Sequence, residues 1–185
     1  NYNPNATVDD GSCVYAIIVS ISDIQGEGLE SEFIDYVVTT TGVVTGVSYA
    51  GFFIQDGYGA YNGIWVYVSS PSVSVGDELS VTGVVAEYNG LTEIGLSSYT
   101  VLSSGNTLPE PVQISTGDLS EAYEGVRVQF VNVPCTMVPD EYGKWQVNDG
   151  TGIADIDDRL SEPQITINLN ESYDIIGVVD SYNNY

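Results

Sequence analysis

The side chains that could do chemistry in this chain are almost entirely carboxylates. Its 185 residues include 26 Asp and Glu, three Lys and Arg and no His, so the formal net charge is -23. Without an imidazole the chain has no Ser-His-Asp or Cys-His centre and no usual zinc site. Two facing carboxylates are enough to hydrolyse a glycosidic bond, but no acidic pair here lies in a distinctive motif. We therefore expect a protein without enzymatic activity.

Two acidic clusters offer the oxygen ligands that calcium prefers. Residues 9–12 (DDGS) combine two carboxylates, a hydroxyl and flexible backbone carbonyls within one turn. In residues 155–158 (DIDD), strand alternation would place the first and third residues on one face, where a cation would screen their repulsion. The alternative interpretations are a solvated turn and an exposed polar strand face. No cofactor is required; calcium is a candidate, with Asp9, Asp10, Asp155 and Asp157 as its ligands.

Aromatic residues crowd the middle of the first half of the chain. Alternation along strands assigns Phe53 and Trp65 to the core, whereas Tyr58 and Tyr61 lie in a glycine-rich loop and should be exposed. Exposed tyrosines without neighbouring cations suit contact with a glycan or a protein. Three cations cannot line a groove that follows phosphates, because each neutralised phosphate needs its own Lys or Arg. We therefore expect a glycan as a candidate partner and no nucleic acid.

The composition also indicates the compartment. An acidic chain rich in Tyr, Ser, Thr and Asn, with glycosylation sequons at Asn5 and Asn170, is typical of a secreted or cell-surface protein. In that setting we expect Cys13 and Cys135 to form a disulfide, within one chain or between neighbours, with two free thiols as the alternative. No window approaches the ~20 apolar residues that cross a bilayer, so we expect no membrane span.

Strands must position these side chains. Short β-branched segments bounded by Gly, Pro, Asn or Asp are typical of strands, and only residues 119–123 favour a helical turn. The expected strands are residues 16–21, 36–45, 52–55, 63–68, 78–87, 98–102, 112–115, 125–133, 145–148, 153–157, 164–169 and 173–180. The sequence therefore predicts an all-β protein.

An internal repeat divides the chain. Residues 56–59 (DGYG) recur as residues 149–152 (DGTG), and residues 83–85 (GVV) recur as residues 177–179. We interpret each Asp-Gly pair as a hairpin turn that needs positive φ. The polar stretch between the copies contains two prolines, which favour an extended, stiff connection. The predicted organisation is an N-terminal arm at residues 1–15, β-domains at residues 16–104 and 112–185, and a linker at residues 105–111.

The order of these motifs resembles a known fold. It runs from residues 41–46 (TGVVTG) through residues 51–57 (GFFIQDG) to residues 75–85 (VGDELSVTGVV), and residues 145–152 (WQVNDGTG) repeat its middle part. This order is similar to that of the oligonucleotide/oligosaccharide-binding (OB) domains of secreted nucleases and cell-surface proteins of the Bacteroidetes type. The resemblance implies two tandem Greek-key β-barrels. Residues 1–13 resemble the end of a short Asp- and Cys-containing repeat of secreted proteins, which also implies secretion.

The two copies end differently. In the first, residues 88–90 (YNG) are followed by a further strand, whereas residues 181–185 (SYNNY) stop where that strand should begin. We expect the second barrel to lack its last strand and to expose an edge that templates β-addition, for which the arm of a neighbouring chain is a candidate donor. The sequence thus predicts a secreted, non-enzymatic structural subunit that self-assembles into a filament or surface layer by β-strand complementation. The alternative is an accessory binding module, for a glycan, protein or nucleic acid, of a larger secreted nuclease or adhesin.

Overall fold

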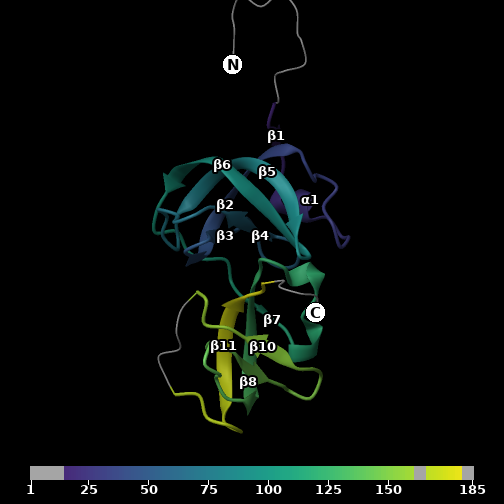
Figure 1. Ribbon diagram of the computed structural model, residues 1–185, viewed down its shortest axis with the longest axis vertical. Coiled ribbons are helices and arrows are strands. Elements are labelled where there is room, and N and C mark those ends of the chain that lie inside the picture. The colour runs from purple at the N-terminus through teal and green to yellow at the C-terminus, as the bar shows by residue number, and fades with distance from the viewer. Residues whose placement is uncertain (1–14, 161–165, 181–185) are drawn as a thin grey trace, which may run out of the picture.

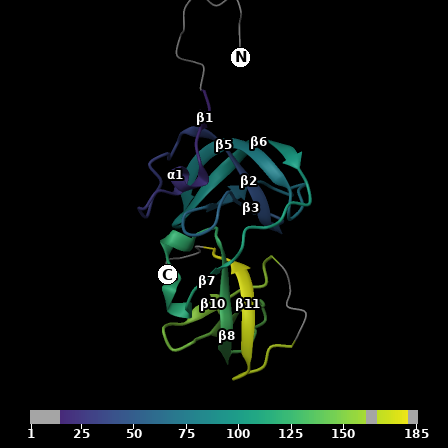
Figure 2. The same cartoon turned by 180° about the vertical axis from the view of Figure 1, so that it is seen from behind.

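The β-branched segments form two sheets, one in each half of the chain. The computed structural model describes residues 15–160 and 166–180. The first sheet contains β1 (Ile17–Ile18), β2 (Val37–Ser48), β3 (Gly51–Gln55), β4 (Gly63–Tyr67), β5 (Glu78–Tyr88) and β6 (Leu91–Ser103). The second contains β7 (Val112–Gln113), β8 (Arg127–Met137), β9 (Trp145–Val147), β10 (Ala154–Ile156) and β11 (Ser172–Val178). The all-β prediction is confirmed, and Figure 1 and Figure 2 show the two sheets stacked along the long axis.

The first sheet closes on itself. Its strand order is β1-β2-β3-β4-β6-β5, and β5 also pairs with β2. β4 and β6 run parallel, whereas the other pairs of this circuit are antiparallel. Closure leaves none of the five strands β2 to β6 with a single neighbour, which removes the exposed edges that open sheets present.

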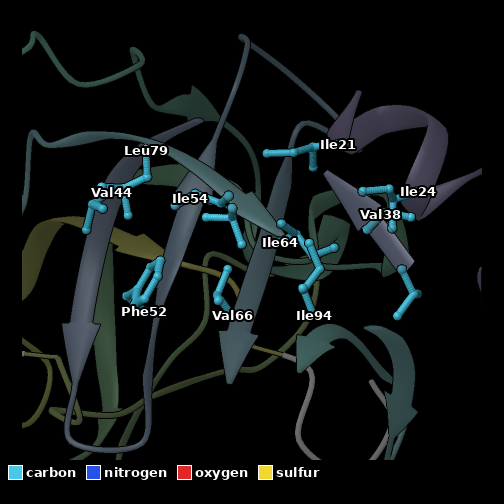
Figure 3. Packing of buried hydrophobic residues seen from close by; sticks show 12 residues of the cluster. Ile21, Ile24, Val38, Val44, Phe52, Ile54, Ile64, Val66, Leu79 and Ile94 are labelled. Atoms are coloured by element: carbon cyan, nitrogen blue, oxygen red, sulfur yellow. The ribbon is translucent and has the colours of Figure 1, made fainter. Parts of the chain in front are cut away.

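Alternation along the strands turns one face of the first sheet inward. On β2, Val38, Thr40, Gly42 and Val44 are buried. The residues between them are partly or fully exposed. Figure 3 shows the resulting core, in which side chains from β2 to β6 meet beside Ile21 and Ile24 of helix α1 (Ile21–Gln25). Burying each such side chain contributes about 1.5–3 kcal/mol, so this core holds the first half together.

The second sheet is open among the described residues. Its strand order is β10-β9-β8-β11, and β7 runs parallel to β8. There, β11 pairs with β8 alone and β10 with β9 alone. By the sequence repeat, β8, β9, β10 and β11 correspond to β2, β3, β4 and β5. The described part of the second half therefore lacks a counterpart of β6, the strand that joins β4 to β5.

The two halves meet through closely spaced backbone. A Cβ atom at Gly125 would lie 2.5 Å from the carbonyl carbon of Gly63, and Gly125 has a φ of +69°. Only glycine suits that position, because a side chain would be both crowded and strained. Beside it, the backbone nitrogen of Arg127 donates to Oε1 of the buried Gln55 at 3.0 Å. These contacts hold the start of β8 against the end of β3.

Three short helical segments modify the predicted pattern. α1 begins inside the strand expected at residues 16–21, because Ser20 caps it: its Oγ accepts from the backbone nitrogen of Asp23 at 3.1 Å. The turn expected at residues 119–123 is the 3-10 helix η2 (Glu121–Tyr123), and a further one, η1 (Thr116–Asp118), precedes it. None of the helices in the described part of the chain is long and apolar enough to cross a membrane.

Two expected strands differ in extent from the observed ones. β6 begins at Leu91 rather than Ser98, so the closing strand has 13 residues and extends well beyond the expected range of 98–102. Residues 166–169, the described part of the strand expected at 164–169, are not a strand. There the backbone nitrogen of Asn168 donates to the hydroxyl of Tyr173 at 2.8 Å, and the chain turns before β11.

Candidate strand-acceptor site

The repeated Asp-Gly motif anchors a helical turn in each half. Oδ2 of Asp56 accepts from the backbone nitrogen of Ile21 at 2.9 Å, and Oδ2 of Asp149 accepts from that of Thr116 at 3.1 Å. The first N–H groups of a helical turn have no partner within it, so a carboxylate stabilises its start. The repeat is therefore structural in both copies, and it shows that the two halves are built alike around this contact.

The pKa values of the two aspartates are nevertheless shifted in opposite directions. Burial raises the pKa of Asp56 above its usual value, although the N–H of Ile21 opposes the shift. Hydrogen bonds from the hydroxyls of Thr151 and Thr116 hold the pKa of Asp149 well below its usual range. The charged carboxylate is thus favoured in the second half by hydroxyl groups and disfavoured in the first half by burial.

The glycines of this motif correct the turn prediction in part. Gly150 has the expected positive φ, +100°, but Gly57 does not lie in the left-handed region. A Cβ at Gly57 would instead lie 2.8 Å from Oδ1 of Asn62. Glycine at this position leaves room for the side chain of Asn62 rather than providing backbone freedom.

The second repeated motif reveals how the halves differ. A Cβ atom at Gly83 on β5 would clash with the carbonyl oxygen of Gly95 and lie 2.5 Å from Cγ2 of Ile94, both on β6. At Gly177, the corresponding residue of β11, no heavy atom of the described chain lies within 4 Å of the same position. The close approach of β6 therefore requires glycine at position 83. Gly177 has no such neighbouring strand in the described chain.

A groove occupies the place of the absent strand. It lies between β10 and β11, has a volume of about 1420 Å³ and reaches the facing surface of the first sheet. Its apolar lining includes residues of the second-sheet core cluster, namely Phe130, Trp145, Ile156, Ile167, Tyr173 and Ile175, together with residues of the first half such as Val47, Phe53 and Val73. On the same strand edge, Ile176 is 53% exposed. An unpaired strand edge beside apolar surface can accept a further strand.

All three cationic side chains of the molecule line this groove: Arg127, Lys144 and Arg159. Arg159 pairs with Asp180 and lies over Trp65, 4.8 Å from the centroid of its ring. Within the described chain, neither Arg127 nor Lys144 has a carboxylate oxygen within 4.0 Å. Five aspartates also line the groove: Asp155, Asp157, Asp158, Asp174 and Asp180. Its lining is thus far closer to neutral than the rest of a chain whose net charge is -23.

The expected calcium ligands do not form a cluster in the described structure. Oδ1 of Asp155 accepts from Nε2 of Gln146 at 2.8 Å, and Oδ1 of Asp157 accepts a backbone N–H at 2.9 Å. No group of three or more His, Cys, Asp or Glu residues in the described ranges is placed to hold a metal ion. Asp9 and Asp10 lie outside those ranges, so calcium binding by them stays a prediction.

The two loop tyrosines have different surroundings. Tyr58 is 66% exposed, as expected for a residue that contacts a ligand. Tyr61 is only partly exposed, because its loop packs against the second half, where its backbone nitrogen donates to the carbonyl of Ala122 at 2.7 Å. The prediction that both are free surface residues therefore holds for Tyr58 and not for Tyr61.

The cysteine and glycosylation predictions fall partly outside the described residues. Cys135 is buried in the core of the second sheet, and its Sγ lies 3.2 Å from the carbonyl oxygen of Met137. Asn170 is exposed in the turn before β11, where a glycan would have room. Cys13 and Asn5 lie outside the described ranges, so the disulfide between Cys13 and Cys135 and the glycan at Asn5 stay predictions.

A buried carboxylate without any sequence signal lies between the halves. Glu124, just before β8, is 1% exposed. Its Oε1 accepts from the backbone nitrogen of Thr92 at 2.9 Å and from Nε2 of Gln25 at 3.3 Å, and its Oε2 is buried without a partner in the described chain. Burial, reinforced by repulsion from Glu121 and Glu87, raises the pKa of Glu124 to about 8. Glu124 thus ties the second half to α1 and β6 and carries a proton at neutral pH.

Comparison with known proteins adds no further constraint. No protein-family model matches this chain, and searches of curated proteins and of solved structures find no match either.

Proposed function

We propose that this protein is a secreted, non-enzymatic structural subunit that self-assembles by β-strand complementation into a filament or surface layer. The acceptor is the opening between β10 and β11, and the added strand takes the place that β6 fills in the first sheet. Main-chain hydrogen bonds along a strand edge give such a contact its affinity, and neighbouring side-chain pockets give it specificity.

The observation that carries this proposal is the pair Gly83 and Gly177. Glycine in the interior of a strand costs conformational entropy and packs nothing, so it often marks the close approach of another backbone. At Gly83 that backbone is β6, whereas around Gly177 the described chain leaves the position open. A strand supplied by another chain gives Gly177 the neighbour that Gly83 already has.

The architecture that supports this function is two tandem OB-like barrels at residues 16–104 and 112–185, joined by the linker at 105–111 and preceded by the arm at 1–15. The circuit of five strands in the first sheet agrees with a small Greek-key barrel of this kind. The second sheet repeats four of those strands in the same order. The acidic composition and the sequons at Asn5 and Asn170 favour secretion.

An accessory glycan-binding module is the second candidate. The exposed Tyr58 borders a hollow of about 330 Å³ that is also lined by Thr41, Asp56 and Thr107. An aromatic ring beside hydroxyl and carboxylate groups suits a sugar ring, because it offers both stacking and hydrogen bonds. Calorimetric titration with oligosaccharides tests this candidate: it requires binding that is lost in Tyr58→Ala and retained in Tyr49→Ala, a change at another exposed tyrosine.

Sedimentation velocity over a wide concentration range, with electron microscopy of the same samples, tests assembly. The full chain should form oligomers that grow with concentration, and Gly177→Val should remain monomeric because its side chain fills the space that the strand needs. Gly95→Ala is the matched control: its Cβ would lie 3.6 Å from the carbonyl oxygen of Val84, an ordinary contact within the closed sheet. A full chain that stays monomeric throughout, or a Gly177→Val variant that assembles normally, would contradict the proposal.

A further inference from the structure

The first sheet specifies the direction of the strand that the second sheet lacks. β6 runs antiparallel to β5, starting opposite its last residue, where Leu91 pairs with Tyr88. It runs parallel to β4, but pairs with β4 only from Glu93 to Gly95. By the repeat, the missing strand enters at the C-terminal end of β11 and runs antiparallel to it. Only a short stretch of it has neighbours on both sides, and the remainder forms an edge.

The charges of the groove limit where charged side chains of that strand can lie. Two of its three cations, Arg127 and Lys144, have no carboxylate within 4.0 Å in the described chain, although the molecule contains 26 acidic residues. Surface ion pairs contribute little to affinity, but they select the register and discourage cationic competitors. The lining also contains five aspartates, so acidic groups of an added strand fit only beside Arg127 and Lys144.

We propose that residues 1–14 of a second copy of this chain donate the strand; this inference rests on the proposed self-assembly. The segment contains Asp9 and Asp10 and no cation. Its residues 2–8 alternate between apolar and polar types, with Tyr2, Ala6 and Val8 on the apolar side, which is the period of a strand with one buried face. Because Pro4 lacks an N–H, the stretch with two neighbours falls within residues 5–14.

The position of β1 favours donation between copies over closure within one chain. Residues 1–14 precede β1, which lies at the end of the first sheet that faces away from the second sheet (Figure 1 and Figure 2). The groove lies beyond the opposite end of the first sheet, between β10 and β11. A contact between the segment before β1 of one chain and the second half of the next is heterologous, and repeated addition produces an open filament.

Two full-chain variants test the donor and the acceptor separately. The double variant Ala6→Asp/Val8→Asp places charges on the apolar side of the arm and leaves the described fold untouched, whereas Gly177→Val blocks the acceptor. Each variant alone should be monomeric by sedimentation velocity. Mixed together they should form heterodimers and nothing larger, because one retains a working acceptor and the other a working arm. Asn1→Asp/Asn3→Asp, which adds the same two negative charges outside the apolar side of the arm, is the matched control and should assemble.

A synthetic peptide of residues 1–14 provides the second readout. Excess peptide should dissociate the assemblies of the native chain, and a scrambled peptide of the same composition should not. Lys144→Glu should weaken peptide binding by about fivefold at most, as expected for a surface ion pair. If Ala6→Asp/Val8→Asp assembles normally while Gly177→Val does not, the donor inference is wrong and the proposed function stands. If Gly177→Val also assembles normally, the proposed function itself is wrong.

Discussion

The two halves of this molecule share a sequence repeat, but only the first half forms a closed sheet in the described chain. In the first, β6 closes the sheet around a core whose twelve clustered residues are completely buried. In the second, the described core cluster has seven buried residues, and β10 and β11 have one neighbour each. Yet Gly83 and Gly177 occupy corresponding positions in both. The comparison shows that the repeat has glycine at both positions, although only Gly83 has a neighbouring closing strand in the described chain.

Substituting valine for each of the two corresponding glycines should give the largest difference in stability between the halves. Gly83→Val forces a side chain into the backbone of β6, so we expect a loss of about 3 kcal/mol in the free energy of unfolding. Gly177→Val meets open space, and a β-branched residue suits an extended strand, so the monomer should keep or slightly gain stability. Urea denaturation of both variants at a concentration where the native chain is monomeric measures the difference. Equal losses in the free energy of unfolding would contradict the claim that only Gly83 has a neighbouring strand.

The link between the halves should respond to pH through Glu124. Its pKa is raised to about 8 in the folded state, so the protonated side chain contributes stability that is complete below its ordinary pKa of about 4.3 and is lost as pH rises through 8. We expect the free energy of unfolding to fall by about 5 kcal/mol over this range because of Glu124. In Glu124→Gln this part of the pH dependence should disappear, since the neutral amide cannot ionise.

The matched control for that change is Glu141→Gln, which removes one negative charge from an exposed loop. It should leave the slope of stability against pH between 5 and 9 as in the native chain. Thermal melts of the three proteins across this range provide the measurement. A slope that is the same in Glu124→Gln as in Glu141→Gln would remove Glu124 as its source.

The helical-turn anchors offer a smaller and more local comparison. Asp56→Ala should cost about 1 kcal/mol, the usual effect of losing a side chain that accepts from the first N–H groups of a helical turn. Asp149→Ala should also destabilise, with a different pH dependence: its pKa is lowered in the folded state, so its contribution is present above its unfolded pKa and lost in acid. The difference between Asp149→Ala and the native chain should therefore shrink below pH 4. If the difference in stability between Asp149→Ala and the native chain stayed constant down to pH 2, the hydroxyl contacts would not be the cause of the lowered pKa of Asp149.

Local pattern was enough to predict most of the fold, and long-range contacts explain what it missed. β-branched segments between turn residues located ten of the eleven described strands to within a few residues, because a strand's signal lies in its own sequence. α1 was not predicted because Ser20 and Asp56, which are distant in sequence, act together to start a helix in an apolar segment. The repeat led to the expectation of an open second sheet because it compares segments of the chain directly, and the described part of that sheet is open.

The site was harder to predict for the same reason. Glu124 has no signal because its partners Gln25 and Thr92 are 99 and 32 residues away. The convergence of Arg127, Lys144 and Arg159 on one groove likewise depends on how β8, β9 and β10 pack. In contrast, the calcium prediction at Asp155 and Asp157 relied on spacing alone, and their oxygens accept local hydrogen bonds in the described structure.

Hydrogen exchange on β11 tests the central claim most directly. Exchange of the amides of residues 172–178 should slow as protein concentration rises, because an added strand pairs the edge that β8 does not cover, while β5 should be equally protected at every concentration. In Gly177→Val, β11 should exchange at the monomer rate throughout. Exchange of β11 that is independent of concentration in the native chain, under conditions where sedimentation shows oligomers, would contradict strand complementation at this edge.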